Sequence, residues 1–212
     1  MAAMVSRMTS APVPLGQHVP DADQIVVMSG VDWAGYEALL ALRGERSRPK
    51  LAYLDGVVEL MSTSRGHEGV KSSIGRLVEA YCLEVGIDFS PYGNWTQKQQ
   101  LEEAGCEPDE CYIFGPDPKA IEWPQLAIEI VWTRGGIDKL EIYRRLGIGE
   151  VWFWDSDTLA VYVLGKRRHE RRERSACLPG LDLAMICRIA QVEPTSAAIR
   201  QLREELRAGA AR

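Results

Sequence analysis

The segment at residues 125–132, QLAIEIVW, constrains the fold of this chain more than any other. It is an apolar run with one charged residue, Glu129, and such runs are typical of strands covered on both faces. Alternation along the strand places Glu129 on one face with Ala127 and Val131. An ionised carboxylate there costs several kcal/mol unless it is compensated. The compensation is a buried ion pair, such as one with an Arg on a neighbouring helix, a raised pKa, or a metal ion.

A second group of acidic residues lies earlier in the chain, at the start of the strand expected before residues 125–132. Residues 106–115, CEPDECYIFG, contain Glu107, Asp109 and Glu110 and then become apolar. A solvated loop accommodates such charges without any function. However, Asp109 opens one strand and Glu129 lies 20 residues later on the next. If the two strands are neighbours, both carboxylates converge on one hard cation, and oxygen ligands with retained waters suit Mg²⁺.

A lysine follows Glu129 in the chain, at the start of the next expected helix. Lys139 lies ten residues after Glu129, near the start of a helical pattern at 137–147. An ammonium group beside a metal-bound water or a phosphate orients a nucleophile and stabilises developing negative charge. Two acids and one lysine on a mixed sheet therefore indicate a phosphodiester-cleaving site. The alternative is a structural ion-pair network of the same groups.

The remaining patterns predict a mixed α and β fold. The sequence Asp55-Gly56 predicts a hairpin turn within 51–61, and apolar residues at helical spacing before Gly86 predict a long core helix. Further helices are expected at 31–44, 137–147, 183–190 and 195–208. Further strands are expected at 95–101, 111–115, 125–132, 150–155 and 158–164.

Length and composition suit one globular domain. We expect residues 1–20 to form a flexible N-terminal leader and residues 21–212 to form a single domain. The five cysteines form no CxxC pair, so neither a zinc site nor a disulfide framework is expected. A reducing compartment fits this pattern, and the expected location is the cytoplasm.

The charge of the chain is unevenly distributed. The net charge of −5 argues against broad attraction to nucleic acid. Residues 134–174 nevertheless hold ten Lys or Arg against seven Asp or Glu, and residues 165–175 alone hold six against two. This short basic segment either contacts phosphates or forms a solvated edge hairpin whose charges discourage strand pairing.

Four segments in order resemble a known family. EPDECYIFG, LAIEIV and GGIDKLEIYRRLGIGEVWFWD, with the earlier YLDGVVELMSTSRGHEGV, are similar to the bacterial restriction-endonuclease-like family of the PD-(D/E)XK nuclease superfamily. The resemblance runs from about residue 31 to about residue 182. Asp109 matches the acid of "PD" and Glu129 the acid of the next strand. The superfamily commonly places its lysine two residues after that acid, where Val131 stands, but this family moves it to the following helix, where Lys139 stands.

The resemblance implies both a fold and an activity. The implied fold is α/β (α+β), with a restriction-endonuclease-like core: a mixed central sheet flanked by helices, an N-terminal hairpin region and C-terminal helices. The implied activity is Mg²⁺- or Mn²⁺-dependent hydrolysis of DNA phosphodiesters, with Asp109 and Glu129 as metal ligands and Lys139 at the reacting centre. A homodimer is also expected. The alternative is a nuclease-fold module without turnover that binds DNA or a protein partner.

Two further residues have an expected place in the site. Glu68 resembles the extra acid that many members carry at the start of the long helix, and His67 beside it is typical of the family. Each also has an ordinary interpretation. A histidine at a helix start is commonly a capping or surface residue, and a glutamate there is favoured by the helix dipole.

Overall fold

The computed structural model describes residues 22–133 and 135–210. Its first layer is a five-stranded antiparallel sheet of strand order β1-β3-β2-β6-β5. The helix α1 (Trp33–Arg43) packs on this sheet through Tyr36, which stacks on Tyr53. The strands are β1 (Gln24–Ser29), β2 (Lys50–Leu54), β3 (Val57–Ser62), β5 (Gln97–Gln99) and β6 (Ala104–Cys106).

The second layer is a six-stranded mixed sheet of order β11-β10-β9-β8-β7-β4. All its pairs are antiparallel except β8 with β9. A parallel pair requires a crossover, and here the crossover contains α3 (Lys139–Arg145). The strands are β4 (Phe89–Pro91), β7 (Glu110–Phe114), β8 (Leu126–Ile130), β9 (Glu150–Asp155), β10 (Thr158–Leu164) and β11 (His169–Arg172).

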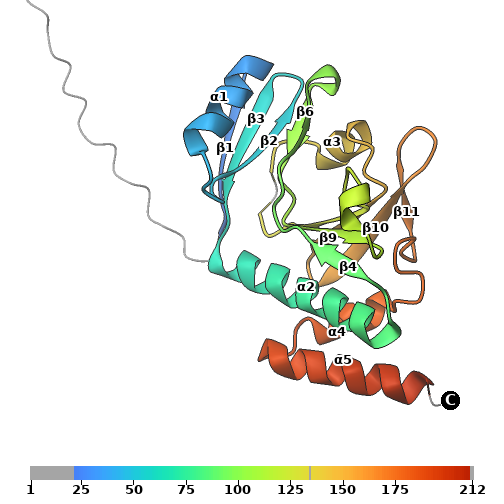
Figure 1. Ribbon diagram of the computed structural model, residues 1–212. Helices are drawn as coiled ribbons and strands as arrows, with labels where there is room; N and C mark the ends of the chain where they lie inside the picture. The colour runs from blue at the N-terminus through green and yellow to red at the C-terminus, as the bar shows by residue number, and fades with distance from the viewer. Residues whose placement is uncertain (1–21, 134, 211–212) are drawn as a thin grey trace, which may run out of the picture.

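The two faces of β8 have different partners. Leu126, Ile128 and Ile130 belong to a core with α2 (Arg65–Val85), α4 (Leu183–Ile189) and α5 (Thr195–Ala210). Figure 1 shows these three helices together along one side of the molecule. Ala127, on the opposite face, packs with Ile142 of α3. Glu129 follows Ala127 by two residues and therefore faces α3.

The mixed α and β fold expected from the sequence is confirmed, with small differences. The strand expected at 95–101 is only Gln97–Gln99, because the 3₁₀ turn η1 (Gln100–Glu102) ends it. A second 3₁₀ turn, η2 (Pro118–Ala120), lies between β7 and β8. The expected leader, residues 1–20, lies outside the described residues. No helix within the described part of the chain is long and apolar enough to span a membrane.

The contact between α1 and its sheet requires a glycine at position 105. A Cβ atom at Gly105 would lie 2.6 Å from the Tyr36 hydroxyl oxygen. We predict that Gly105→Ala lowers the free energy of unfolding by about 1–3 kcal/mol through overpacking. The control is Gly69→Ala on α2, where a Cβ meets nothing within 4 Å; helix propensity makes this change neutral or stabilising by up to about 1 kcal/mol. Urea unfolding of both variants is the measurement, and equal losses would contradict the steric explanation.

Candidate active site

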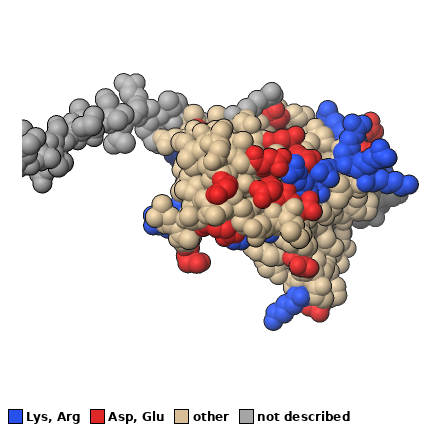
Figure 2. All heavy atoms as spheres, turned by 90° about the horizontal axis from the view of Figure 1, so that it is seen from above, with Lys and Arg blue, Asp and Glu red and all other residues tan. Residues whose placement is uncertain are grey.

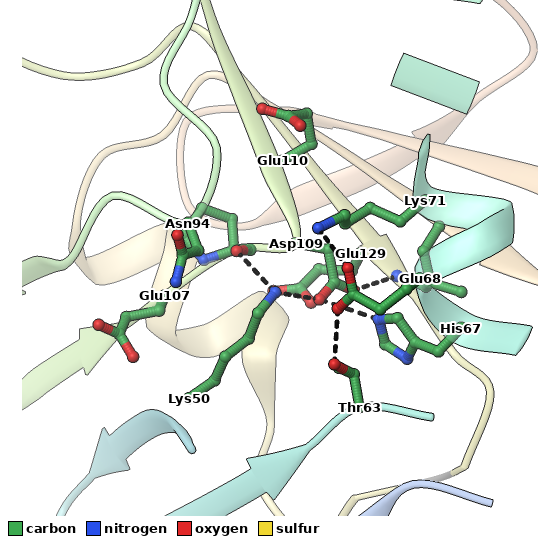
Figure 3. Close-up of polar contacts among 12 residues, drawn as sticks. Lys50, Thr63, His67, Glu68, Lys71, Asn94, Glu107, Asp109, Glu110 and Glu129 are labelled. Atoms are coloured by element: carbon green, nitrogen blue, oxygen red, sulfur yellow. Dashed lines mark hydrogen bonds and ion pairs between the residues drawn. The ribbon is translucent and has the colours of Figure 1, made fainter. Parts of the chain in front are cut away.

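The site forms where the start of β7 lies beside the end of β8, since the two strands are antiparallel. Asp109 directly precedes β7, and its backbone N–H donates to the Ile128 carbonyl oxygen at 3.2 Å. Its Oδ2 accepts a hydrogen bond from the backbone N–H of Ile130 at 2.7 Å. Asp109 thus binds the residues on both sides of Glu129, and Figure 3 shows Asp109 at the centre of the cluster with Lys50 and His67. The predicted neighbouring positions of the two acids follow from these bonds, and the convergence of both carboxylates on one cation stays a prediction.

Two cationic side chains contact Asp109 Oδ1. The Lys50 ammonium bonds to it and donates to the Pro108 carbonyl oxygen at 3.1 Å, and His67 Nε2 lies 3.0 Å from it. Lys50, His67 and Asp109 are all buried. Burial by itself favours a neutral carboxyl, but the Lys50 charge and His67 outweigh it and hold the pKa of Asp109 well below its usual range. Asp109 is therefore a buried, ionised carboxylate.

His67 is a buried link between two carboxylates. Its Nδ1 lies 2.9 Å from Asp23 Oδ2, and Asp23 Oδ1 accepts a hydrogen bond from the backbone N–H of Ser64. Burial opposes the charged imidazole, but Asp109 and Asp23 outweigh it and raise the pKa of His67 to about 9. The ring is therefore positively charged at neutral pH. The sequence left open whether His67 belongs to the site or is an ordinary capping or surface residue. A surface position is wrong, because the side chain is fully buried.

Glu129 has partners on α3. Its Oε2 accepts from the Lys139 ammonium at 2.6 Å, and its Oε1 accepts from the Tyr143 hydroxyl. The compensating ion pair is thus made by a lysine, whereas an arginine was the example expected. Burial raises the pKa of Glu129, the Lys139 charge opposes this shift, and the Asp109 charge adds to it. One turn of α3 positions both partners, since Lys139 and Tyr143 are four residues apart.

Glu68 forms a separate set of contacts at the start of α2. Its Oε1 accepts from Thr63 at 2.6 Å and lies 2.9 Å from Arg48, and its Oε2 lies 2.7 Å from Lys71. Burial favours the neutral acid, but Lys71 and Thr63 dominate and lower the pKa of Glu68 to about 2. Glu68 stands near the Asp109 cluster in Figure 3, with both oxygens bound to these neighbours.

The other acids of the segment at 106–115 point elsewhere. Glu107 accepts from Thr96 and from the backbone N–H of Leu51, and it pairs with Arg43. Glu110 accepts from the backbone N–H of Gly93. In Figure 3 both side chains extend away from Asp109. Of the three acids in this segment, only Asp109 belongs to the site.

A pocket of about 400 Å³ reaches Glu129 and Lys139 from the α3 side of the sheet. Its wall includes Glu59 of β3, Phe153 of β9 and Tyr162 of β10. Glu59 is buried and accepts a hydrogen bond from the backbone N–H of Gly136 at 2.7 Å. This bond ties β3 to the connection between β8 and α3, so it supports the segment that carries Lys139.

The site offers oxygen ligands that suit a hard cation, but only a small number of them. Within residues 22–133 and 135–210, no group of three or more His, Cys, Asp or Glu side chains is arranged to hold a metal ion. Asp109 and Glu129 supply two neighbouring carboxylates. This donor set suits Mg²⁺ or Mn²⁺, since Mg²⁺ commonly binds through one or two carboxylates and keeps several waters.

Two members of the cluster were missed in the sequence. Lys50 gave a weak signal, since it is a charged residue at the head of the apolar strand KLAYL. Asp23 gave none, because an acid just before the first strand, far from the other acids in the chain, has no distinguishing pattern. Lys50 reaches the cluster through the pairing of β2 with β3. Asp23 reaches it through the hydrogen bond that it accepts from the backbone N–H of Ser64.

The comparison with family models places the chain. Residues 33–195 match Uma2, the family described as "Putative restriction endonuclease". Since the match covers well over half of the chain, the protein belongs to this family. Its mixed sheet and flanking helices are those of a restriction-endonuclease-like fold, as the sequence predicted. A search of curated proteins gave no match.

The lowered pKa of Glu68 has a consequence for stability. A folded pKa of about 2 against an ordinary 4.5 means that ionised Glu68 stabilises the fold above pH 4.5, and that this contribution disappears as the pH falls toward 2. We predict that Glu68→Gln costs about 1–3 kcal/mol at pH 7 and clearly less at pH 3. Urea unfolding at both pH values tests this, with exposed Glu204→Gln on α5 as the control. A cost that does not depend on pH would refute the assignment.

Proposed function

We propose that this protein is a divalent-metal-dependent endonuclease that hydrolyses DNA phosphodiester bonds. The observation that carries the proposal is the junction of Asp109 and Glu129 on neighbouring strands, with Lys139 against Glu129 at a pocket. Membership of the family supports a nuclease-like function, and restriction-endonuclease-like families typically use divalent metals. Asp109 and Glu129 would hold Mg²⁺ or Mn²⁺, which would lower the pKa of a bound water and polarise the phosphate.

The side chains of the chain itself have distinct roles in this proposal. Lys139 lines the pocket and offsets negative charge on the phosphate while it orients the attacking water. Tyr143 is a positioning residue, because its hydroxyl fixes one oxygen of Glu129. His67 is also a positioning residue that fixes Asp109, and its burial removes it from direct contact with substrate. Glu68 shapes the start of α2 through its ion pairs.

The basic segment at 165–175 supports DNA as the partner. It forms the connection of β10 to β11 and the residues after β11, and its Lys and Arg side chains are exposed. Figure 2 shows Lys and Arg gathered at one end of the molecule, and in Figure 1 that end holds the β10–β11 hairpin. Opposed residues Ala127, Val151, Tyr162 and Arg171 form one row from β8 to β11. Arg171 thus shares the sheet face of Ala127 and Glu129, and three strand spacings place it about 14 Å from Ala127, two residues before Glu129.

A module that binds without cleaving is the second candidate. The observation that favours it is the internal pairing of Asp109 and Glu129 with Lys50, His67 and Lys139, which leaves the acids compensated without a metal. Such a module would retain DNA in chelator and show no cleavage with Mg²⁺ or Mn²⁺. The homodimer and the cytoplasmic location stay predictions.

Removal of Lys139 tests the proposed chemistry. We predict that Lys139→Met lowers Mg²⁺-dependent cleavage of duplex DNA at least about 100-fold, because a group aimed at developing charge supplies that much. Its cost in free energy of unfolding should be about 3–5 kcal/mol, since the change leaves the buried Glu129 without its charged partner. Cleavage assays well below both melting temperatures are the measurement, with exposed Lys98→Met as the control. Cleavage that survives in the variant, or in wild type with chelator, would exclude this mechanism.

A measurement of DNA binding in the absence of cleavage tests the basic segment at 165–175. We predict that Arg167, Arg171 and Arg174 changed together to Gln weaken duplex DNA binding in chelator at least about tenfold. The slope of log affinity against log salt should shrink by about one for each phosphate that is no longer neutralised. The control changes exposed Arg46, Lys119 and Arg200 to Gln, which removes the same charge elsewhere. Fluorescence anisotropy measures both, and equal weakening by the two triple variants would mark a non-local charge effect.

A further inference from the structure

Lys50 is a buried lysine in contact with a proposed metal ligand. It begins β2, its side chain is 6% exposed, and its ammonium contacts Asp109 Oδ1 and the Pro108 carbonyl oxygen. A buried ammonium is costly unless it is paired, and a lysine with its flexible stem is seldom fully buried. The site described above uses Lys139 at the pocket, so Lys50 has no assigned role there.

The partners of the two acids cover all four carboxylate oxygens. Asp109 Oδ1 contacts Lys50 and His67, and its Oδ2 accepts from Ile130. Glu129 Oε1 accepts from Tyr143, and its Oε2 accepts from Lys139. A cation that binds between these acids must therefore take an oxygen from a protein donor or share it with one.

Among the donors to Asp109, Lys50 is the one most able to leave. The Ile130 N–H is fixed in the backbone, and His67 is held on its other side by Asp23. Lys50 also has another acid within its surroundings. It lines a small cavity of about 10 Å³ together with Glu59, the buried acid on the strand paired with β2. Glu59 is thus a second buried carboxylate beside the same cavity, available as a counter-ion for an ammonium displaced from Asp109.

From this geometry we infer that Lys50 is an internal counter-ion that competes with the divalent cation for Asp109. The inference rests on the proposed function, because it concerns the metal of that site. Ammonium and dication repel each other at the same carboxylate, and the repulsion is strong where water is excluded. Lys50 keeps the metal-free site stable and lowers its affinity for the metal, so metal binding requires its displacement from Asp109.

The test is a calorimetric titration of the full chain with Mn²⁺. Lys50→Met removes the competing charge, so it should bind Mn²⁺ at least about tenfold more tightly than wild type, while its melting temperature in chelator falls. Lys50→Gln, which keeps a hydrogen-bond donor, should show the same tightening and replaces Lys50→Met if that variant fails to fold. The control is Lys98→Met, which removes the same charge from an exposed pair with Glu37 and should bind Mn²⁺ like wild type.

A double variant locates the effect at Asp109. In Asp109→Asn with Lys50→Gln, the gain in Mn²⁺ affinity should disappear, because the carboxylate that Lys50 guards is gone. Unchanged or weaker binding in the single Lys50 variants, with Mn²⁺ bound by wild type, overturns the inference and leaves the proposed function standing. Absence of Mn²⁺ binding in wild type and in both Lys50 variants overturns the proposed metal site and this inference with it.

Discussion

The arrangement of this site depends on the ionised Asp109 carboxylate within the protein interior. An unpaired charge there would destabilise the fold by several kcal/mol, so the surrounding elements supply compensation. β2 provides Lys50, the start of α2 provides His67, and β8 provides a backbone N–H. Both sheets therefore meet at one carboxylate. The cost of burying that charge is offset by contacts that also hold the two sheets and the long helix in register.

Glu129 extends the same logic to the other side of β8. The parallel pairing of β8 with β9 requires a crossover, and the first turn of α3 in that crossover carries both Lys139 and Tyr143. A lysine two residues after the acid would lie on the same strand as Glu129. Lys139 instead lies on α3, so it approaches Glu129 from the sheet face that α3 covers, and it also lines the pocket. Lys139 thus contacts Glu129 although it lies ten residues later in the chain.

The internal pairing of the acids separates stability from activity. Acids held only by a metal would make folding depend on that metal, whereas here lysine and histidine side chains neutralise them. In the proposed nuclease, a metal ion would compete with these cations, and its affinity would reflect a difference between two well-compensated states.

Local patterns in the sequence determined the elements and the candidate acids. The alternation in LAIEI, the turn at Asp55-Gly56 and the helical spacing before Gly86 specify local structure, because neighbouring residues in the chain produce those periods. Asp109, Glu129 and Lys139 stood out as charges beside apolar strands or at a helix start. Only the tertiary structure revealed Lys50 and Asp23, paired Glu68 with Arg48 and Lys71, and directed the Glu107 and Glu110 side chains away from Asp109. The reason is physical: Lys50 lies 59 positions from Asp109 and Asp23 lies 41 positions from Ser64, and no local period encodes which distant charge completes a buried pair.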